Sequence, residues 1–282
     1  CEHQQQRKWP EQRPERMPME YREMKMQAGT ERPSLLGFGC MRFPKTPEGK
    51  IDENGAAELI DAAIRNGVNY LDTAYPYHEG DSEPFMGRLL KRYDRKSVYL
   101  ATKLPMWLVK SLEDAKRLFE EQLERLQVDY IDFYLLHGLN RDRWDTICRL
   151  GLIDWAEALQ RQGRIRYLGF SFHDNYETFE TILTSRKWDF CQIQYNYMDE
   201  HSQAGREGLQ YAHAKGLPVI IMEPLRGGRL VDLLPRSAKK IFELDQEGRT
   251  AAEMAFKWLY HQPEVTCVLS GMNSLAMVRE NV

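Results

Sequence analysis

The stretch of sequence that decides the fold runs from residue 98 to residue 138 and reads VYLATKLPMWLVKSLEDAKRLFEEQLERLQVDYIDFYLLHG. Nearly continuous runs of apolar, β-branched and aromatic residues lie at 98–104 and 130–137, as in parallel strands covered on both faces. Over 111–126, apolar residues instead recur at helical spacing. Ser111 followed by Asp114 is typical of a helix start, with a capping hydroxyl and a carboxylate in the first turn. The stretch predicts one strand–helix–strand unit of a parallel sheet.

The same unit repeats along the chain. Further strand-like runs lie at 35–41, 68–74, 165–172, 190–195, 218–222 and 265–269, and helical spacing recurs over 56–66, 83–92, 153–162, 176–184, 204–214 and 251–260. Gly67, Gly163 and Gly216 fall just past helix ends, where a left-handed cap favours glycine. Eight such units predict a closed (β/α)8 barrel, which typically takes about 250 residues.

A doubly wound open sheet is the alternative fold. It usually has about five or six parallel strands, and its dinucleotide-binding form carries G-x-G-x-x-G after the first strand. Here the sequence Gly37-Phe-Gly39-Cys-Met-Arg42 lacks the third glycine and is followed by Phe-Pro rather than by a helix. The barrel is therefore the favoured prediction.

Composition excludes several classes of protein. The chain has 282 residues, and 39 basic against 42 acidic side chains give a net charge of −3, which argues against an electrostatic nucleic-acid binder. No apolar run approaches the ~18 residues of a membrane span, so we expect no membrane partner. The five cysteines are odd in number and contain no CxxC, which predicts neither a disulfide framework nor a metal site. Reduced thiols of this kind are typical of a cytoplasmic protein.

The two ends of the chain differ from its middle. Residues 1–18 are polar, contain several prolines and begin with Cys, so we interpret them as a disordered or non-native extension and assign the barrel to residues 19–282. Residues 274–282 have helical composition and stop at Val282. We therefore expect the last helix to be truncated and the natural protein to continue beyond residue 282.

Four polar residues follow three consecutive strands. Asp72 ends the second strand, Tyr77 lies in the loop after it, and Lys103 and His137 end the third and fourth strands. Each residue alone has an ordinary structural explanation as a cap, a loop residue or a hydrogen-bonded side chain. Because active sites of (β/α)8 barrels lie at the carboxyl ends of the strands, the four together predict a catalytic site.

The chemistry of this group is specific. A phenol has an ordinary pKa near 10, and a neighbouring ammonium lowers that pKa while a carboxylate holds the ammonium in place. The phenol can then act as a general acid, and a histidine can donate a hydrogen bond to a carbonyl oxygen. Such a set suits protonation of a carbonyl oxygen while hydride is delivered to its carbon. Since no side chain supplies hydride, a nicotinamide cofactor is predicted.

Two later loops are candidates for the cofactor's phosphates. They follow the seventh and eighth strands, the usual phosphate site of this fold, and contain Glu223-Pro-Leu-Arg-Gly-Gly-Arg229 and Ser270-Gly-Met-Asn-Ser274. Glycines allow the backbone to approach a phosphate, and arginines pair with it. Ordinary turns with solvated arginines are the alternative interpretation.

The four residues resemble, in order and spacing, the tetrad of the aldo-keto reductase superfamily. Further landmarks of the resemblance are Gly37-Phe-Gly39, Asp72-Thr-Ala-x-x-Tyr77, Leu136-His137, Gly169-Phe-Ser171 and Gln192-Ile-Gln-Tyr-Asn196. The resemblance covers roughly residues 20 to 282 and implies NAD(P)H-dependent reduction of a small aldehyde or ketone to an alcohol. It implies that Tyr77 donates the proton, that Lys103 and Asp72 tune it, and that His137 orients the substrate.

The resemblance also implies the cofactor site. NADPH is the expected cofactor. NADH stays the alternative because Met277 stands where many NADPH-specific members have an arginine, although Arg279 follows closely. Ser171 and Gln192 are expected to hold the nicotinamide carboxamide, and Met222 stands where many members have a stacking tyrosine. The full expected set is Gly39, Met41, Asp72, Ser171, Gln192, Met222, Glu223, Pro224, Leu225, Gly228, Gly271, Asn273 and Asn281. The expected substrate pocket comprises Tyr75, Trp107, His137, Trp144 and Phe172.

The phrases Gly169-Phe-Ser-Phe-His-Asp174 and Met222-Glu-Pro-Leu-Arg-Gly-Gly228 look most like a bacterial branch of this family. That branch often carries a C-terminal ferredoxin-like domain, so a 4Fe–4S cluster is expected only if such a domain exists beyond residue 282. Two alternative functions stay open. One is a Schiff-base lyase with Lys103 as nucleophile, which a neighbouring Asp72 would oppose by stabilising the ammonium. The other is a non-catalytic barrel subunit that senses nucleotide.

Overall fold

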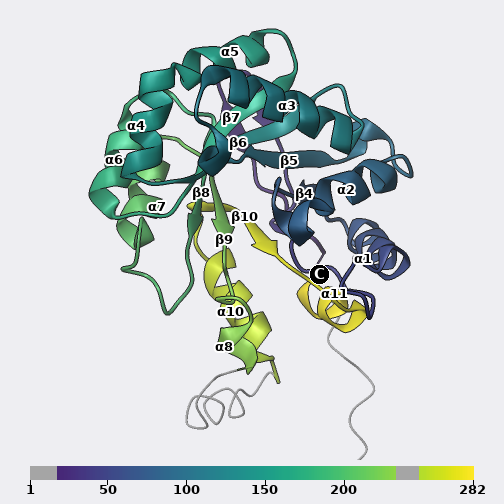
Figure 1. Cartoon of the computed structure of the whole chain (residues 1–282). Coiled ribbons are helices and arrows are strands. Elements are labelled where there is room, and N and C mark those ends of the chain that lie inside the picture. The colour runs from purple at the N-terminus through teal and green to yellow at the C-terminus, as the bar shows by residue number, and fades with distance from the viewer. Residues whose placement is uncertain (1–17, 233–247) are drawn as a thin grey trace, which may run out of the picture.

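Eight parallel strands form a closed barrel in the order in which they occur along the chain (Figure 1). The computed structural model describes residues 18–232 and 248–282. The strands are β3 (Leu36–Gly39), β4 (Tyr70–Asp72), β5 (Tyr99–Leu104), β6 (Ile131–Leu139), β7 (Ile165–Phe172), β8 (Phe190–Gln194), β9 (Val219–Met222) and β10 (Val265–Ser270). Pairing of β10 with β3 closes the barrel. The predicted (β/α)8 fold and all eight predicted strands are confirmed.

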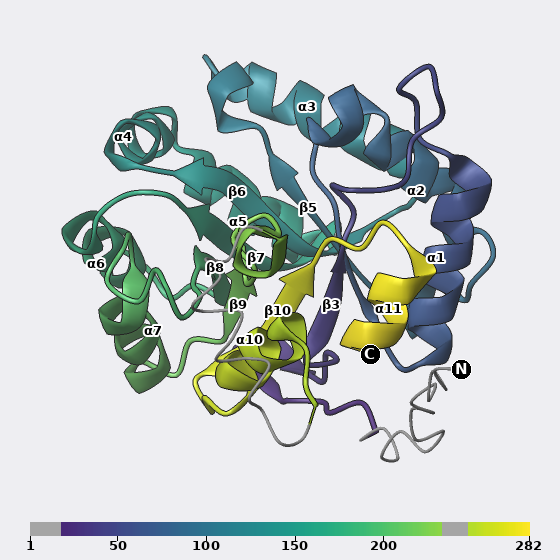
Figure 2. The same ribbon diagram turned by 90° about the horizontal axis from the view of Figure 1, so that it is seen from below.

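The helices surround the barrel (Figure 2). Those that the sequence predicted are α1 (Glu53–Arg65), α2 (Ser82–Leu90), α3 (Leu112–Leu126), α5 (Leu152–Arg161), α6 (Tyr176–Thr184), α7 (Gly205–Ala214), α10 (Ala251–Tyr260) and α11 (Leu275–Asn281), and α11 lies beside α1. The cap of α3 forms as predicted, since the Ser111 hydroxyl accepts from the Asp114 N–H at 3.1 Å. Gly67, Gly163 and Gly216 have positive φ angles of 98°, 72° and 73°, as left-handed helix ends require.

Several elements were not predicted. They are the helices α4 (Arg141–Leu150) and α8 (Arg229–Asp232), the hairpin strands β1 (Met24–Met26) and β2 (Gly29–Glu31), and the 3-10 turns η1 (Tyr77–Gly80), η2 (Arg95–Ser97) and η3 (Met106–Leu108). Helix α4 buries only Trp144 and Ile147 of its apolar residues, so its periodic signal is weak. Residues 1–17 of the predicted N-terminal extension lie outside the described residues.

The strand residues alternate between the barrel interior and the surrounding helices, as the pleat requires. Inside the barrel, a cluster of buried side chains contains Tyr70, Ala101, Phe133, Leu135, Tyr167, Phe190, Ile220, Cys267 and Leu269. Two positions further along their strands, the same inward face carries Asp72, Lys103, His137 and Gln192. The alternation thus places polar side chains inside the carboxyl end of the barrel, above an apolar interior.

The β1–β2 hairpin closes the other end of the barrel. Met24 in β1 is fully buried within the interior cluster. Glu31 in β2 accepts hydrogen bonds from the hydroxyl groups of Tyr167 at 2.7 Å and Tyr99 at 2.9 Å, which fixes the hairpin to strands β7 and β5. The hairpin therefore completes the core at the amino end of the strands and leaves the carboxyl end open.

No helix within residues 18–232 and 248–282 is long and apolar enough to cross a membrane. In the same ranges, no group of three or more His, Cys, Asp or Glu side chains is placed to hold a metal ion. Cys40, Cys148, Cys191 and Cys267 are free thiols.

The buried side chain of Met24 in the β1–β2 hairpin contributes to the stability of the barrel. We expect Met24→Ala to lower the free energy of unfolding by about 2–4 kcal/mol, because it leaves a cavity in a fully buried cluster. Met26→Ala is the matched control, since Met26 packs against the same cluster but is only half-buried and should cost less. Denaturant unfolding monitored by tryptophan fluorescence measures both, and an unchanged stability in Met24→Ala would show that the hairpin does not close the barrel.

Candidate active site

A buried ion pair lies at the centre of the site. Strands β4 and β5 pair Asp72 with Ala101, so Lys103 projects inward beside the Asp72 carboxylate. The Lys103 ammonium donates to both Asp72 oxygens, at 3.0 and 2.9 Å, and to the carbonyl oxygen of Thr73 at 2.7 Å. A buried ammonium is costly unless it is paired and hydrogen-bonded, and these three acceptors meet that requirement.

This pairing keeps Lys103 charged. Burial by itself lowers the pKa of Lys103, but the Asp72 carboxylate and the Tyr77 hydroxyl outweigh burial and raise the pKa above its ordinary value. The side chain therefore stays an ammonium at neutral pH. It cannot act as a free-amine nucleophile without losing these contacts.

The Tyr77 hydroxyl lies next to the ammonium. Lys103 Nζ is 3.3 Å from the hydroxyl and 4.8 Å from the centre of the Tyr77 ring. Burial raises the pKa of Tyr77, and the Lys103 charge opposes this only in part. The expected net lowering is wrong for this reason: loss of hydration disfavours the phenolate more than one ammonium favours it. Tyr77 thus holds its proton at neutral pH, as a proton donor must.

The backbone after Tyr77 turns sharply. His78 and Glu79 both have left-handed φ angles, 53° and 54°, which are uncommon for side chains other than glycine. The His78 ring stabilises the turn, because its Nε2 accepts the Phe43 N–H at 3.0 Å and its ring stacks on that of Phe43. Only a neutral imidazole can accept this bond, and burial lowers the pKa of His78 accordingly.

His137 completes the group from β6. Its ring is edge-on to that of Tyr77, with centres 6.4 Å apart, and to that of Trp107, with centres 5.2 Å apart. Burial and the nearby positive charge of Lys103 hold the pKa of His137 well below its usual range. A neutral imidazole beside a protonated phenol offers two hydrogen-bond donors to one carbonyl oxygen.

A donor and an acceptor suited to a carboxamide lie on the next two strands. Ser171 and Gln192 are register partners on β7 and β8. The Ser171 hydroxyl accepts the Gly138 N–H at 2.7 Å, so its own proton is left to donate. The Gln192 amide nitrogen is 3.5 Å from the Met222 sulfur, and its oxygen is buried without a partner in the described part of the chain. A primary carboxamide, which has one carbonyl and one NH2, complements this pair.

The two candidate phosphate loops face a further arginine. A Cβ atom placed on Gly227 would lie 3.0 Å from Arg42 Nη2, and one on Gly271 would lie 3.1 Å from Arg42 Cδ. Arg42 therefore lies against both loops, which also contain Glu223, Pro224, Leu225, Gly228 and Asn273. Its neighbour Met41, which the resemblance implied as a cofactor residue, is 40% exposed, whereas Arg42 was not predicted.

Two other expected cofactor residues lie close to the same loops. Gly39 approaches Gly271, whose nitrogen would be 3.4 Å from a Cβ atom on Gly39. The Asn281 amide donates to the Ser270 hydroxyl at 3.2 Å and so connects α11 to the end of β10.

The predicted substrate pocket is only partly assembled. Trp107, which is 36% exposed, lies beside His137. Tyr75 instead donates to Glu121 on α3 at 3.1 Å and stacks under the Arg125 guanidinium. The remaining two aromatic residues, Trp144 and Phe172, are buried in the outer core layer. Phe172 points outward because it directly follows the inward-pointing Ser171 on β7. These three side chains therefore do not line the pocket.

A buried polar network that was not predicted from the sequence holds the backbone of Lys103. Gln122 on α3 donates to the Lys103 carbonyl oxygen at 2.7 Å and to the Glu83 carboxylate at 3.0 Å. Thr102 also donates to Glu83, at 2.9 Å. Burial raises the pKa of Glu83 to about 7, while these two hydrogen bonds oppose the rise. The only sequence signal is a polar Gln122 on the otherwise apolar face of α3.

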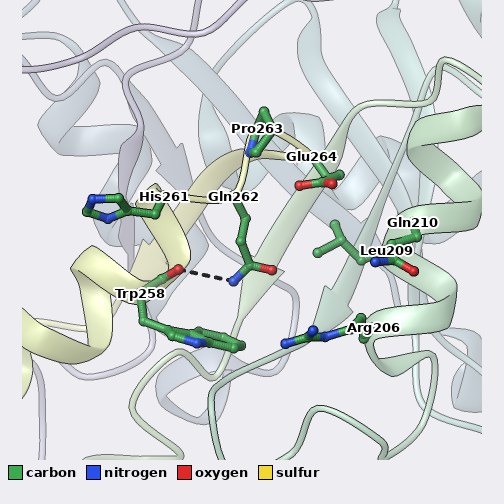
Figure 3. Close-up of a pocket in the computed structure, with 8 residues that line it drawn as sticks. All are labelled: Arg206, Leu209, Gln210, Trp258, His261, Gln262, Pro263 and Glu264. Carbon is green, nitrogen blue, oxygen red and sulfur yellow. Dashed lines mark hydrogen bonds between the residues drawn. The ribbon is translucent and has the colours of Figure 1, made fainter.

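A hollow lies on the outer surface, where α7 approaches the end of α10 (Figure 3). Its lining includes Arg206, Trp258, Gln262 and Glu264. The Gln262 amide donates to the Trp258 carbonyl oxygen at 3.0 Å, and Arg206 pairs with Glu200. This hollow lies next to the start of β10 rather than its carboxyl end, so it is separate from the candidate active site.

Comparisons with known proteins identify relatives of the chain and of its fold. The profile of the aldo/keto reductase family matches residues 35–282. L-galactose dehydrogenase of Arabidopsis thaliana is 27% identical over 269 residues, which cover 88% of this chain and 83% of that protein. NADH-specific methylglyoxal reductase of Escherichia coli is 26% identical over 293 residues, covering 88% and 89%. The holo form of an aldo-keto reductase from Bacillus halodurans superposes with a TM-score of 0.77 at 28% identity, covering 93% and 89%.

The buried Glu83 predicts a pH-dependent stability. Because its pKa in the folded protein lies above the ordinary value of 4.5, the folded state binds a proton that the unfolded state has released, and stability falls as pH rises toward about 7. We expect Glu83→Gln to remove this pH dependence. Between about pH 5 and pH 8, the free energy of unfolding of the variant should therefore rise relative to that of the wild type. Denaturant unfolding across this range measures the difference. A difference independent of pH would contradict the assignment.

Proposed function

The chain belongs to the aldo/keto reductase family and is an oxidoreductase, and from this premise we propose that it reduces an aldehyde or ketone to the alcohol at the site formed by Asp72, Tyr77, Lys103 and His137. The observation that carries the proposal is the buried chain of contacts from the Asp72 carboxylate through the Lys103 ammonium to the Tyr77 hydroxyl. It holds the protonated Tyr77 hydroxyl beside an ammonium that can stabilise the phenolate left after proton transfer.

Each residue has a distinct role. His137 and Tyr77 both donate to the substrate's carbonyl oxygen, which fixes the substrate and polarises its C=O bond. Tyr77 then transfers its hydroxyl proton to that oxygen, and the Lys103 ammonium stabilises the phenolate that remains. Asp72 holds the ammonium in position. When bound, a reduced nicotinamide supplies hydride to the carbonyl carbon.

The chain offers residues to hold that cofactor. Ser171 would donate to the carboxamide oxygen, and Gln192 would accept from the carboxamide nitrogen. Arg42 and the glycines of the two loops would face the phosphates. Family membership favours NADPH. NADH is the alternative, because Met277 offers no charge to a 2′-phosphate and such a charge would have to come from Arg279, two residues further on.

The alternatives are less well supported. A Schiff-base lyase needs an uncharged lysine, whereas Asp72 keeps Lys103 charged. A nucleotide sensor would not need a proton donor, yet Tyr77 and His137 converge beside the ammonium. The E. coli relative is named for methylglyoxal, which makes small aldehydes the first substrates to test.

Removal of the proposed proton donor tests this function. We expect Tyr77→Phe to lower kcat for aldehyde reduction by about 100-fold or more, because the carbonyl oxygen loses its general acid. Affinity for the nicotinamide nucleotide, measured by tryptophan fluorescence, should change little. Tyr75→Phe is the matched control, since that phenol bonds to Glu121 on the outer side of the barrel and should keep its activity.

Retained turnover in Tyr77→Phe would place the proton donor elsewhere. A loss of equal size in Tyr75→Phe would show that the loop as a whole, and not the Tyr77 hydroxyl, is required.

A further inference from the structure

An arginine outside the tetrad lies beside His137. Arg143 is in the first turn of α4, and its Nη1 donates to the carbonyl oxygen of Gly138 at 2.7 Å. Its guanidinium carbon is 5.7 Å from the centre of the Trp107 ring, the same ring that flanks His137. The close approach depends on Gly138, because a Cβ atom there would lie 2.9 Å from Arg143 Nη1.

Arg143 makes no ion pair with any described residue. Other arginines do, for example Arg125 with Glu121 and Arg166 with Asp132. The side chain is half-buried, so its charge is neither neutralised nor fully solvated. A half-buried guanidinium without a carboxylate partner is a ready site for an anion.

Three side chains that can carry positive charge lie near His137. Lys103, His173 and Arg143 all disfavour protonation of His137. Asp174 accepts the Arg141 and Asn175 N–H groups, and neither Asp174 nor any other described carboxylate forms an ion pair with Arg143. Lys103 is paired with Asp72, and burial lowers the pKa of His173 and leaves it neutral at neutral pH, so the charge left for an anionic ligand is that of Arg143.

We infer that Arg143 is a substrate-binding residue and that the preferred substrate is a short oxo acid, with a carboxylate a few bonds from its reactive carbonyl group. This inference rests on the proposed carbonyl reductase function. The substrate's carboxylate and carbonyl group must be close together because the residues that would bind them are adjacent. Gly138 holds the Arg143 guanidinium, and the preceding residue, His137, would bind the carbonyl oxygen. With Nη1 committed to Gly138, the remaining N–H edge of the guanidinium matches the planar fork of a carboxylate.

Paired substrates test the inference. We expect the wild type to reduce 4-oxobutanoate with a kcat/KM about tenfold or more above that of its uncharged methyl ester. Arg143→Met should lower kcat/KM for the acid about 10- to 100-fold, mainly through KM, and change that for the ester less than about twofold. Arg143→Lys should restore part of the loss. Arg141→Met, two residues away on the exposed start of α4, should leave both substrates unaffected.

Each other outcome separates the inference from the function. If the wild type reduces the ester as well as the acid, the reductase function stands and the oxo-acid inference fails. If Arg143→Met loses both substrates equally, Arg143 only positions Gly138 and His137. If glyceraldehyde 3-phosphate, but not 4-oxobutanoate, loses rate in Arg143→Met, the anion is a phosphate and the carboxylate assignment is wrong. If the wild type reduces no aldehyde at all, the proposed function itself fails.

Discussion

The site depends on one interaction, the buried ion pair between Lys103 and Asp72. An ammonium without solvent at this depth requires acceptors on several sides, and the closed barrel provides them because β4 and β5 are neighbours. Residues around the ion pair hold it and Tyr77 in position. Gln122 holds the Lys103 backbone, Glu83 holds Gln122, and the turn stabilised by His78 brings Tyr77 within reach of the ammonium. The position of the phenol is thus a consequence of how the lysine is buried.

The two halves of the barrel carry different kinds of functional groups. Strands β4 to β6 and the loops after them present an ion pair, a phenol and a neutral imidazole, which the proposed function directs at a carbonyl oxygen. Strands β7 to β10 present the Ser171–Gln192 pair and the two glycine-containing loops, which suit a nucleotide. Since successive inward positions along neighbouring strands meet at one end, both halves converge over the same apolar interior, which the N-terminal hairpin closes from below.

The barrel and the four catalytic candidates were predictable, because continuous apolar runs mark buried parallel strands and active sites follow their carboxyl ends. The sequence does not show on which side of the backbone a residue near a strand end lies, so Phe172 and Tyr75 were wrongly assigned to the pocket. Arg143 and Glu83 were missed because they lie on helices. The pKa of Tyr77 could not be predicted from residue types, since it depends on how much water the fold excludes.

In the proposed reaction, hydride from a bound nicotinamide reaches the carbonyl carbon while Tyr77 protonates the carbonyl oxygen. The most direct measurement uses NADPH deuterated at C4 of its nicotinamide, with an aldehyde as substrate and mass spectrometry of the product. We expect an alcohol that carries one deuterium on its former carbonyl carbon when the transferring position is labelled, and none when only the opposite face is labelled. Cofactor consumption without deuterium in the alcohol from either label would show that the hydride does not reach the carbonyl carbon.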